Sequence, residues 1–143
     1  MRLRRRSMIR GTTISAGLLD TSVVIALDQA GSLEIPERSA ISVITLGELR
    51  AGVLLARDES SRSHRKSRLE FARDAFEAMP VDAHVAHHYG EAVAWARSER
   101  RAAKASDLFV IATAAASQLA LVTRDKAQAV IARGVGVEVS DGS

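Results

Sequence analysis

The sequence contains no cysteine, only two prolines and few aromatic residues. Among its 143 residues are three phenylalanines, one tryptophan and one tyrosine. Without cysteine there can be no disulfide framework, no thiolate zinc site and no thiol nucleophile, so any metal must be bound by oxygen or imidazole ligands. This composition fits a reducing compartment, and we expect a cytoplasmic protein. No apolar stretch approaches the roughly 20 residues of a membrane span, so none is predicted.

The apolar content is sufficient for one folded domain. Apolar residues make up 47% of the chain and charged residues 26%, and a domain of about 150 residues buries roughly 70% of the surface that its unfolded chain exposes. The net charge is +3, but much of the positive charge lies in the first ten residues, as Arg2, Arg4, Arg5, Arg6 and Arg10. We therefore expect a disordered basic arm, 1–13, and a folded domain, 14–143. The arm could also bind nucleic acid or a membrane surface.

Short apolar or β-branched runs alternate with segments of helical periodicity along the folded domain. Strands are expected at 14–19, 40–44, 121–122 and 135–139. Helices are expected at 21–27 (ended by Gly31), 45–54, 82–101, 108–119 and 126–132, and 57–73 is expected to be a polar loop that enters a helix ending near Pro80. This alternation predicts an α/β fold, a three-layer sandwich whose central parallel sheet is flanked by helices.

Four carboxylates stand at or just after the expected junctions between a strand and a helix, or open a helix. They are Asp20, Glu48, Asp107 and Asp125. Because α/β proteins bind ligands at the carboxyl ends of their strands, we expect the four to converge. Crowded carboxylates repel one another unless a cation compensates, and Mg²⁺ or Mn²⁺ prefers oxygen ligands. Such an ion can activate water for phosphodiester hydrolysis.

Each of these acids also has a purely structural interpretation. Asp20 and Asp125 are suitable N-caps, Thr45 and Glu48 match a capping box, and Asp107 lies in a first helical turn, where the helix dipole favours an anion. Asparagine preserves a cap and removes the charge. The variants Asp20→Asn and Asp107→Asn are therefore expected to separate the two interpretations.

Four segments in order resemble the PIN domain of VapC toxins, and the resemblance covers about 17–139. The segments are 18–25 (LLDTSVVI), 41–49 (ISVITLGEL), 107–114 (DLFVIATA) and 121–125 (LVTRD). The resemblance implies a three-layer α/β fold and a Mg²⁺- or Mn²⁺-dependent endoribonuclease that cleaves structured RNA such as tRNA. It further implies a homodimer, inhibition by a VapB-type antitoxin and no membrane partner.

The resemblance assigns the acidic site to Asp20, Glu48, Asp107 and Asp125, and it gives Thr21 and Thr123 the role of orienting the metal or a neighbouring carboxylate. The sequence departs from the family pattern at 101–106, which lacks the usual glycine and Ile-Pro pair. It departs again after Asp125, where Ala127 and Gln128 stand near the position of the usual Asp-Phe. These departures concern the loop geometry and the RNA contacts more than the metal site.

Basic residues adjoin the expected site and could hold RNA phosphates, although a solvated helix end is an equally good interpretation of each. They are Arg97, Arg100, Arg101, Lys104 and Arg124. A second cluster contains His84, His87, His88 and Glu91, with the first and third histidines spaced as metal ligands on a helix. No zincin pattern accompanies them, so we interpret the cluster as a partly exposed helix face.

Two other functions are compatible with the sequence. Asp20 could accept a phosphoryl group covalently, but a phosphatase of the haloacid dehalogenase kind requires a second aspartate where Ser22 stands. Alternatively, the domain could bind a partner or RNA without catalysis, with its acids serving only as caps.

Overall fold

The computed structural model describes residues 4–5, 15–30 and 33–141. A five-stranded sheet forms its centre, in the order β5-β4-β2-β6-β7, and every neighbouring pair is parallel. The strands are β2 (Ala16–Leu19), β4 (Arg38–Ser42), β5 (Glu77–Met79), β6 (Ala120–Val122) and β7 (Val139–Ser140). The strand order places β2 in the middle, between strands that follow it in the chain.

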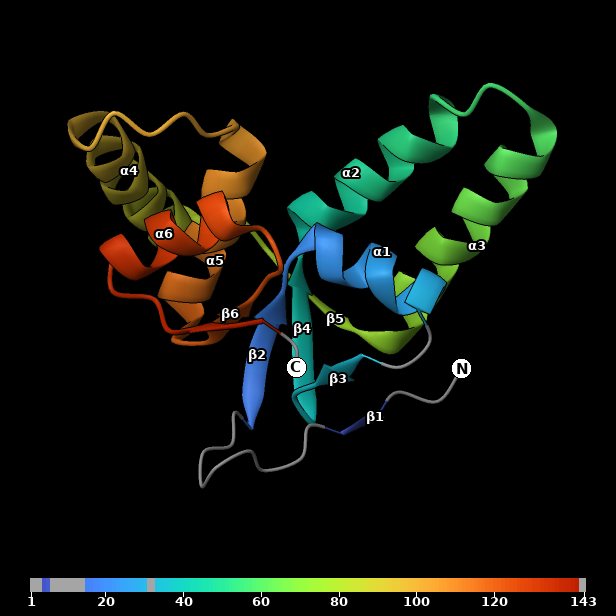
Figure 1. Cartoon of the computed structure of the whole chain (residues 1–143), viewed down its shortest axis with the longest axis horizontal. Coiled ribbons are helices and arrows are strands. Elements are labelled where there is room, and N and C mark those ends of the chain that lie inside the picture. The colour runs from blue at the N-terminus through green and yellow to red at the C-terminus, as the bar shows by residue number, and fades with distance from the viewer. Residues whose placement is uncertain (1–3, 6–14, 31–32, 142–143) are drawn as a thin grey trace.

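Helices cover both faces of this sheet, as Figure 1 shows. They are α1 (Thr21–Ala30), α2 (Val43–Leu54), α3 (Glu59–Ala75), α4 (Ala83–Ser98), α5 (Ala105–Ser117) and α6 (Lys126–Gly134). Helices α1 to α3 lie on one face and α4 to α6 on the other. The predicted three-layer α/β sandwich with a central parallel sheet is confirmed.

Successive residues of the central strands point to opposite faces and so build two separate cores. Leu18 and Leu121 pack with α4, α5 and α6, whereas Leu19 and Val122 pack with α1, α2 and α3. All four side chains are fully buried. The near-continuous apolar character of these strands follows from this burial on both faces.

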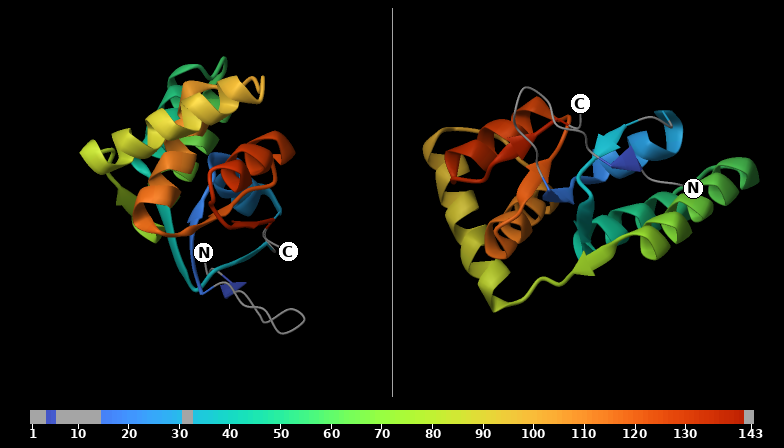
Figure 2. Two further views of the ribbon diagram at one scale, coloured as in Figure 1. Left: turned by 90° about the vertical axis from the view of Figure 1, so that its left-hand side faces the viewer. Right: turned by 90° about the horizontal axis from the view of Figure 1, so that it is seen from below.

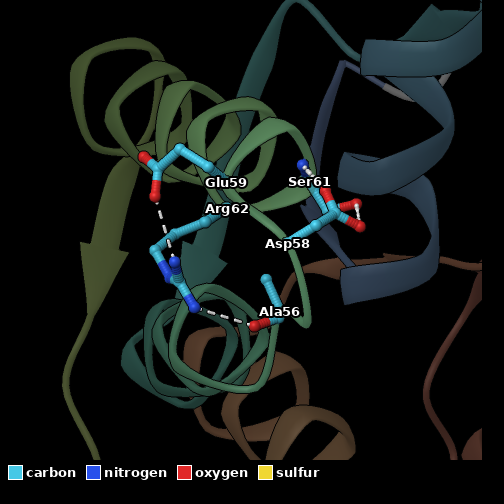
Figure 3. A network of polar contacts seen from close by, with 5 residues as sticks. All are labelled: Ala56, Asp58, Glu59, Ser61 and Arg62. Carbon is cyan, nitrogen blue, oxygen red and sulfur yellow. Dashed lines mark hydrogen bonds and ion pairs between the residues drawn. The ribbon is translucent and has the colours of Figure 1, made fainter.

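The segment 57–73 is largely helical, which corrects the expectation of a polar loop there. Helix α3 begins after Asp58, whose carboxylate accepts a hydrogen bond from the backbone N–H of Ser61 at 2.7 Å. Arg62 donates to Glu59 at 3.1 Å and to the carbonyl of Ala56 at 2.9 Å, which ties the helix start to the preceding turn (Figure 3). The helix buries only a thin apolar stripe, so its polar sequence concealed its periodicity.

Other element boundaries also differ from the sequence expectations. The expected strand 40–44 ends at Ser42, because the Ser42 hydroxyl accepts a hydrogen bond from the N–H of Ile44 at 3.1 Å and caps α2. The short strand β5 was not expected, and β7 begins only at Val139. Both are short edge strands, for which alternation gives little signal.

Part of the N-terminal arm is described by the structure. Arg4–Arg5 form β1, which pairs in parallel with β3 (Glu34–Ile35) in a separate two-stranded sheet. The rest of the arm, Gly31 and the last two residues lie outside the described residues. Within the described part of the chain, no helix is long and apolar enough to cross a membrane.

Gly134, the last residue of α6, is required by close packing against α4. A Cβ atom built at this position would overlap the indole ring of Trp95. We expect Gly134→Ala to lower the free energy of unfolding by about 1–3 kcal/mol, as overpacking does. Gly90→Ala, within α4, is the matched control: a Cβ there meets nothing within 4 Å, so alanine should stabilise the helix by up to about 1 kcal/mol. Urea denaturation measures both changes, and equal stability of the two variants would contradict this packing.

Candidate active site

The strand ends and helix starts bring the predicted acids to one edge of the sheet. Asp20 follows β2 directly, and Asp125 follows β6 after a two-residue turn. Helix α2 begins directly after β4 and carries Glu48 in its second turn, and Asp107 is the third residue of α5. Since all these strands are parallel, their carboxyl ends lie at the same edge.

Asp20 is held in a fixed orientation by hydrogen bonds to both of its carboxylate oxygens. The residue is buried, with 4% of its surface exposed. Its Oδ1 accepts from the N–H of Thr21 at 2.8 Å, and its Oδ2 accepts from the hydroxyls of Ser22 at 2.7 Å and Thr123 at 2.9 Å. Charge-assisted bonds of this kind are about twice as strong as neutral ones, so this side chain is preorganised.

Gln128 supplies a further donor to Asp20, and sequence reasoning did not identify it as a site residue. In the amide orientation that satisfies both ends of the side chain, its nitrogen lies 2.9 Å from Oδ2 and 3.2 Å from Oδ1 of Asp20. Gln128 is buried, with 3% exposed. The available signal was its place in the first turn of α6, near the position where the family's usual Asp-Phe pair is missing.

A short chain of hydroxyl groups positions Glu48. Thr21 donates its hydroxyl proton to Oε1 of Glu48 at 2.6 Å. The hydroxyls of Thr21 and the fully buried Thr45 are 2.9 Å apart. Because the single hydroxyl hydrogen of Thr21 is donated to Glu48, Thr45 is the donor in this second bond. The capping-box interpretation of Thr45 and Glu48 is therefore wrong, because Ser42 is the N-cap and both residues lie inside α2.

Asp107 has no stabilising partner for its carboxylate. It is half-buried, and no hydrogen bond or ion pair reaches its side chain from any residue that the structure describes. Burial, followed by the negative charges of Asp20, Glu48 and Asp125, raises the pKa of Asp107 above its ordinary value, and Lys104 opposes this rise. The other three acids are therefore close enough to Asp107 to disfavour its negative charge.

Asp125 combines two roles. Its Oδ1 accepts from the N–H of Gln128 at 3.1 Å, and it is the N-cap of α6. The hydroxyl of Thr123 accepts from the N–H of Asp125 at 3.1 Å, which joins this turn to Asp20. The cap interpretation holds for Asp125 among the four acids, whereas α5 begins after Lys104 without a side-chain cap.

The donor set at this edge is composed of oxygen ligands and suits a magnesium-like ion. Among the residues that the structure describes, no three acid or histidine side chains converge closely enough to form a ready-made cage. Mg²⁺ does not need one, because it usually takes one or two carboxylates directly and keeps several waters. The repulsion on Asp107 is the feature that a bound cation would relieve.

The basic residues expected to contact RNA are all exposed. Arg97 is near the end of α4, Arg100, Arg101 and Lys104 lie between α4 and α5, and Arg124 lies in the turn after β6. Arg124 and Asp125 also line a hollow of about 530 Å³ beside α6. Lys104 is the one whose charge acts on Asp107.

The histidine cluster on α4 stands apart from the acids. Nδ1 of His88 lies 3.1 Å from a Glu91 oxygen, and the rings of His84 and His88 contact edge to face. None of these groups joins a metal-holding set within the described part of the chain. This agrees with the interpretation of the cluster as a helix face.

The fold and the acidic edge together define the class of protein. A family model described as the PIN domain matches residues 17–134, a range that contains all four acids. The chain belongs to the PIN-domain family.

Individual relatives narrow this assignment to the VapC group. Ribonuclease VapC5 of Mycobacterium tuberculosis is 37% identical over 131 residues, which cover 90% of this chain and 96% of the relative. Ribonuclease VapC8 of the same species is 42% identical over 104 residues, 71% and 92% of the two chains. A crystal structure of VapBC-5 from M. tuberculosis, described as a member of the VapBC family of toxin-antitoxin systems, superposes with a TM-score of 0.77 at 36% identity, covering 87% of this chain and 97% of that one.

Proposed function

We propose that this chain is the toxin of a VapBC-type pair, an endoribonuclease that cleaves structured RNA such as tRNA with Mg²⁺ or Mn²⁺. The observation that carries the proposal is Asp107, a half-buried carboxylate without a partner beside three further acids. The ionised carboxylate of Asp107 destabilises the fold, and it does not cap α5. Relatives that span nearly the whole chain carry the name ribonuclease, which supports RNA as the substrate.

In this proposal the four acids bind the ion directly or through water. The ion supplies positive charge at the reacting phosphate and lowers the pKa of a bound water. Asp20 is held in place by its donors, and Thr21 fixes the orientation of Glu48. Asp107, which lacks hydrogen-bond partners, remains available as a ligand, and Thr123 orients both Asp20 and the Asp125 turn.

The proposed partners follow from the similarity of this chain to its VapC relatives. Solved structures that resemble this chain are described as toxin-antitoxin complexes, so we propose a VapB-type antitoxin as its inhibitor and a homodimer as its assembly. Covalent phosphoryl transfer to Asp20 is disfavoured, because Ser22 stands where a phosphatase of the haloacid dehalogenase kind requires its second aspartate.

Cleavage of bulk tRNA by the purified chain tests this function. We expect products on a denaturing gel with Mg²⁺ or Mn²⁺, none when a chelator is added, and restored cleavage when excess Mn²⁺ follows the chelator. Cleavage that persists in the chelator would contradict a metal-dependent ribonuclease. No cleavage under any condition would favour a binding module.

A further inference from the structure

A second hollow adjoins the acidic edge on the side of α1 to α3. It has a volume of about 300 Å³. Thr21 and Glu48, which belong to the acidic site, form one wall, and Arg65 and Arg68 from α3 form the other. Helices α2 and α3 lie side by side, as Figure 1 and the right-hand view of Figure 2 show. A ligand in this hollow would therefore be next to the acids.

Arg65 is anchored in this hollow without being neutralised. Its Nη1 donates to the backbone carbonyl of Gly52 at 2.8 Å, a bond that fixes the side chain but leaves most of its five N–H donors unused. Among the described residues, no carboxylate lies within ion-pair distance of Arg65.

Arg68 lies deeper and is partly neutralised. Its Nε is 3.1 Å from Oδ2 of Asp28, and its side chain is only 11% exposed. His64 contacts the same Asp28 oxygen at 3.0 Å. Arg68 therefore serves mainly to shape the wall. Arg65 contributes the charge that, among the described residues, no carboxylate pairs with at ion-pair distance, although it acts at longer range on Asp58.

We propose that this hollow binds a backbone phosphate of the RNA substrate, adjacent to the phosphate that is cleaved, with Arg65 as the principal contact. The inference rests on the proposed ribonuclease function. Phosphates repeat along an RNA chain, so a strand with one phosphate at the acids must place its next phosphate beside them. The planar guanidinium fork matches phosphate oxygens, and it can supply two parallel hydrogen bonds.

RNA fits this position better than an acidic peptide does. The hollow shares Glu48 with the acidic site, so an occupant must tolerate a neighbouring carboxylate unless a cation neutralises it. The phosphates of an RNA strand repeat at a regular spacing along its backbone. A strand that this ion holds at one phosphate therefore has a second phosphate to place in the hollow.

Salt-dependent RNA binding tests the proposal, with Ca²⁺ replacing Mg²⁺ so that a divalent cation with oxygen ligands still compensates the acids. The probe is bulk tRNA labelled with fluorescein and followed by fluorescence anisotropy. For Arg65→Gln we expect about ten-fold weaker binding, and a slope of log K against log salt that is smaller by about 0.7–1, the loss of one phosphate contact. Arg65→Lys keeps the charge and should keep the slope.

Arg73→Gln is the matched control, because Arg73 is an exposed residue of the same helix that does not line the hollow. It should change the slope less than Arg65→Gln does. Thermal melting of each variant separates a binding effect from a folding effect. If Arg65→Gln and Arg73→Gln give the same slope, the proposal is wrong. Labelled polyglutamate is a second probe in the same assay, and its loss of binding in Arg65→Gln, with tRNA binding unchanged, would assign the hollow to an acidic protein segment. Absence of cleavage by the unmodified protein would instead overturn only the ribonuclease function.

Discussion

Asp107→Asn should reduce the rate of RNA cleavage at least about 100-fold while leaving the fold intact. Loss of residues that merely support a metal ligand typically costs 10–100-fold, and Asp107 is proposed as a ligand itself. Its side chain has no hydrogen-bond partner among the described residues, so asparagine breaks no contact. Cleavage assays at saturating Mg²⁺ with urea denaturation of the same preparation measure the two effects separately.

The same variant should be more stable than the unmodified protein at neutral pH. The pKa of Asp107 is raised in the folded state, so the ionised carboxylate destabilises the fold. This penalty is complete above the raised pKa and absent below the ordinary value of 3.8. The stability gained by Asp107→Asn should therefore shrink as the pH falls through that window.

Asp74→Asn is the control for this prediction, since Asp74 is an exposed residue of α3 away from the acids. It should leave both cleavage and stability unchanged. If the Asp107→Asn variant cleaves RNA at the normal rate, Asp107 is not a metal ligand that the reaction requires. A variant less stable than the unmodified protein would show that Asp107 has a structural role.

Asp20→Ala should abolish cleavage and also lower the free energy of unfolding by about 3 kcal/mol. Hydrogen bonds to a charged group contribute about 1.5–3 kcal/mol each. The substitution leaves the N–H of Thr21, the Thr123 hydroxyl and the Gln128 amide without their acceptor. Urea denaturation measures this loss of stability, and the dependence of the free energy of unfolding on urea concentration should stay unchanged.

Asp20→Asn should fall between the alanine variant and the unmodified protein in stability. Asparagine retains the volume and one acceptor, but its bonds to Ser22 and Thr123 become neutral and weaker. The sequence interpretation of Asp20 as an ordinary cap implied that asparagine would spare the fold. If Asp20→Asn and Asp20→Ala are both as stable as the unmodified protein, the donors around Asp20 do not hold it as described.

The layered fold was predictable because its strands are short, apolar and buried on both faces. The signal comes from two pairs of apolar residues, Leu18 with Leu19 and Leu121 with Val122. The parallel direction of the strands then follows from the helices that connect them. The bounds of helix α3 were predicted wrongly, with a polar loop over 57–73, because the helix buries little beyond Leu69 and Ala72. Its cap at Asp58 was visible in the sequence, but an N-cap residue alone is weak information.

At the site, the sequence identified the acids but not the contacts that orient them. Gln128 lies far along the chain from Asp20, and only the pairing of β2 with β6 brings them together. The hydroxyl chain from Thr45 through Thr21 to Glu48 likewise depends on the start of α2 at Val43. Local patterns favoured a capping box there, since they carry no information about contacts between distant segments.

The central claim is that Asp20, Glu48, Asp107 and Asp125 form one acidic centre that a divalent cation neutralises. Isothermal titration of Mn²⁺ into the unmodified protein, Asp107→Asn and Asp74→Asn tests this claim without any RNA. We expect the unmodified protein and Asp74→Asn to bind Mn²⁺ equally, and Asp107→Asn to bind it at least about 10-fold more weakly. Equal binding by all three proteins, or no binding by the unmodified one, would contradict the account.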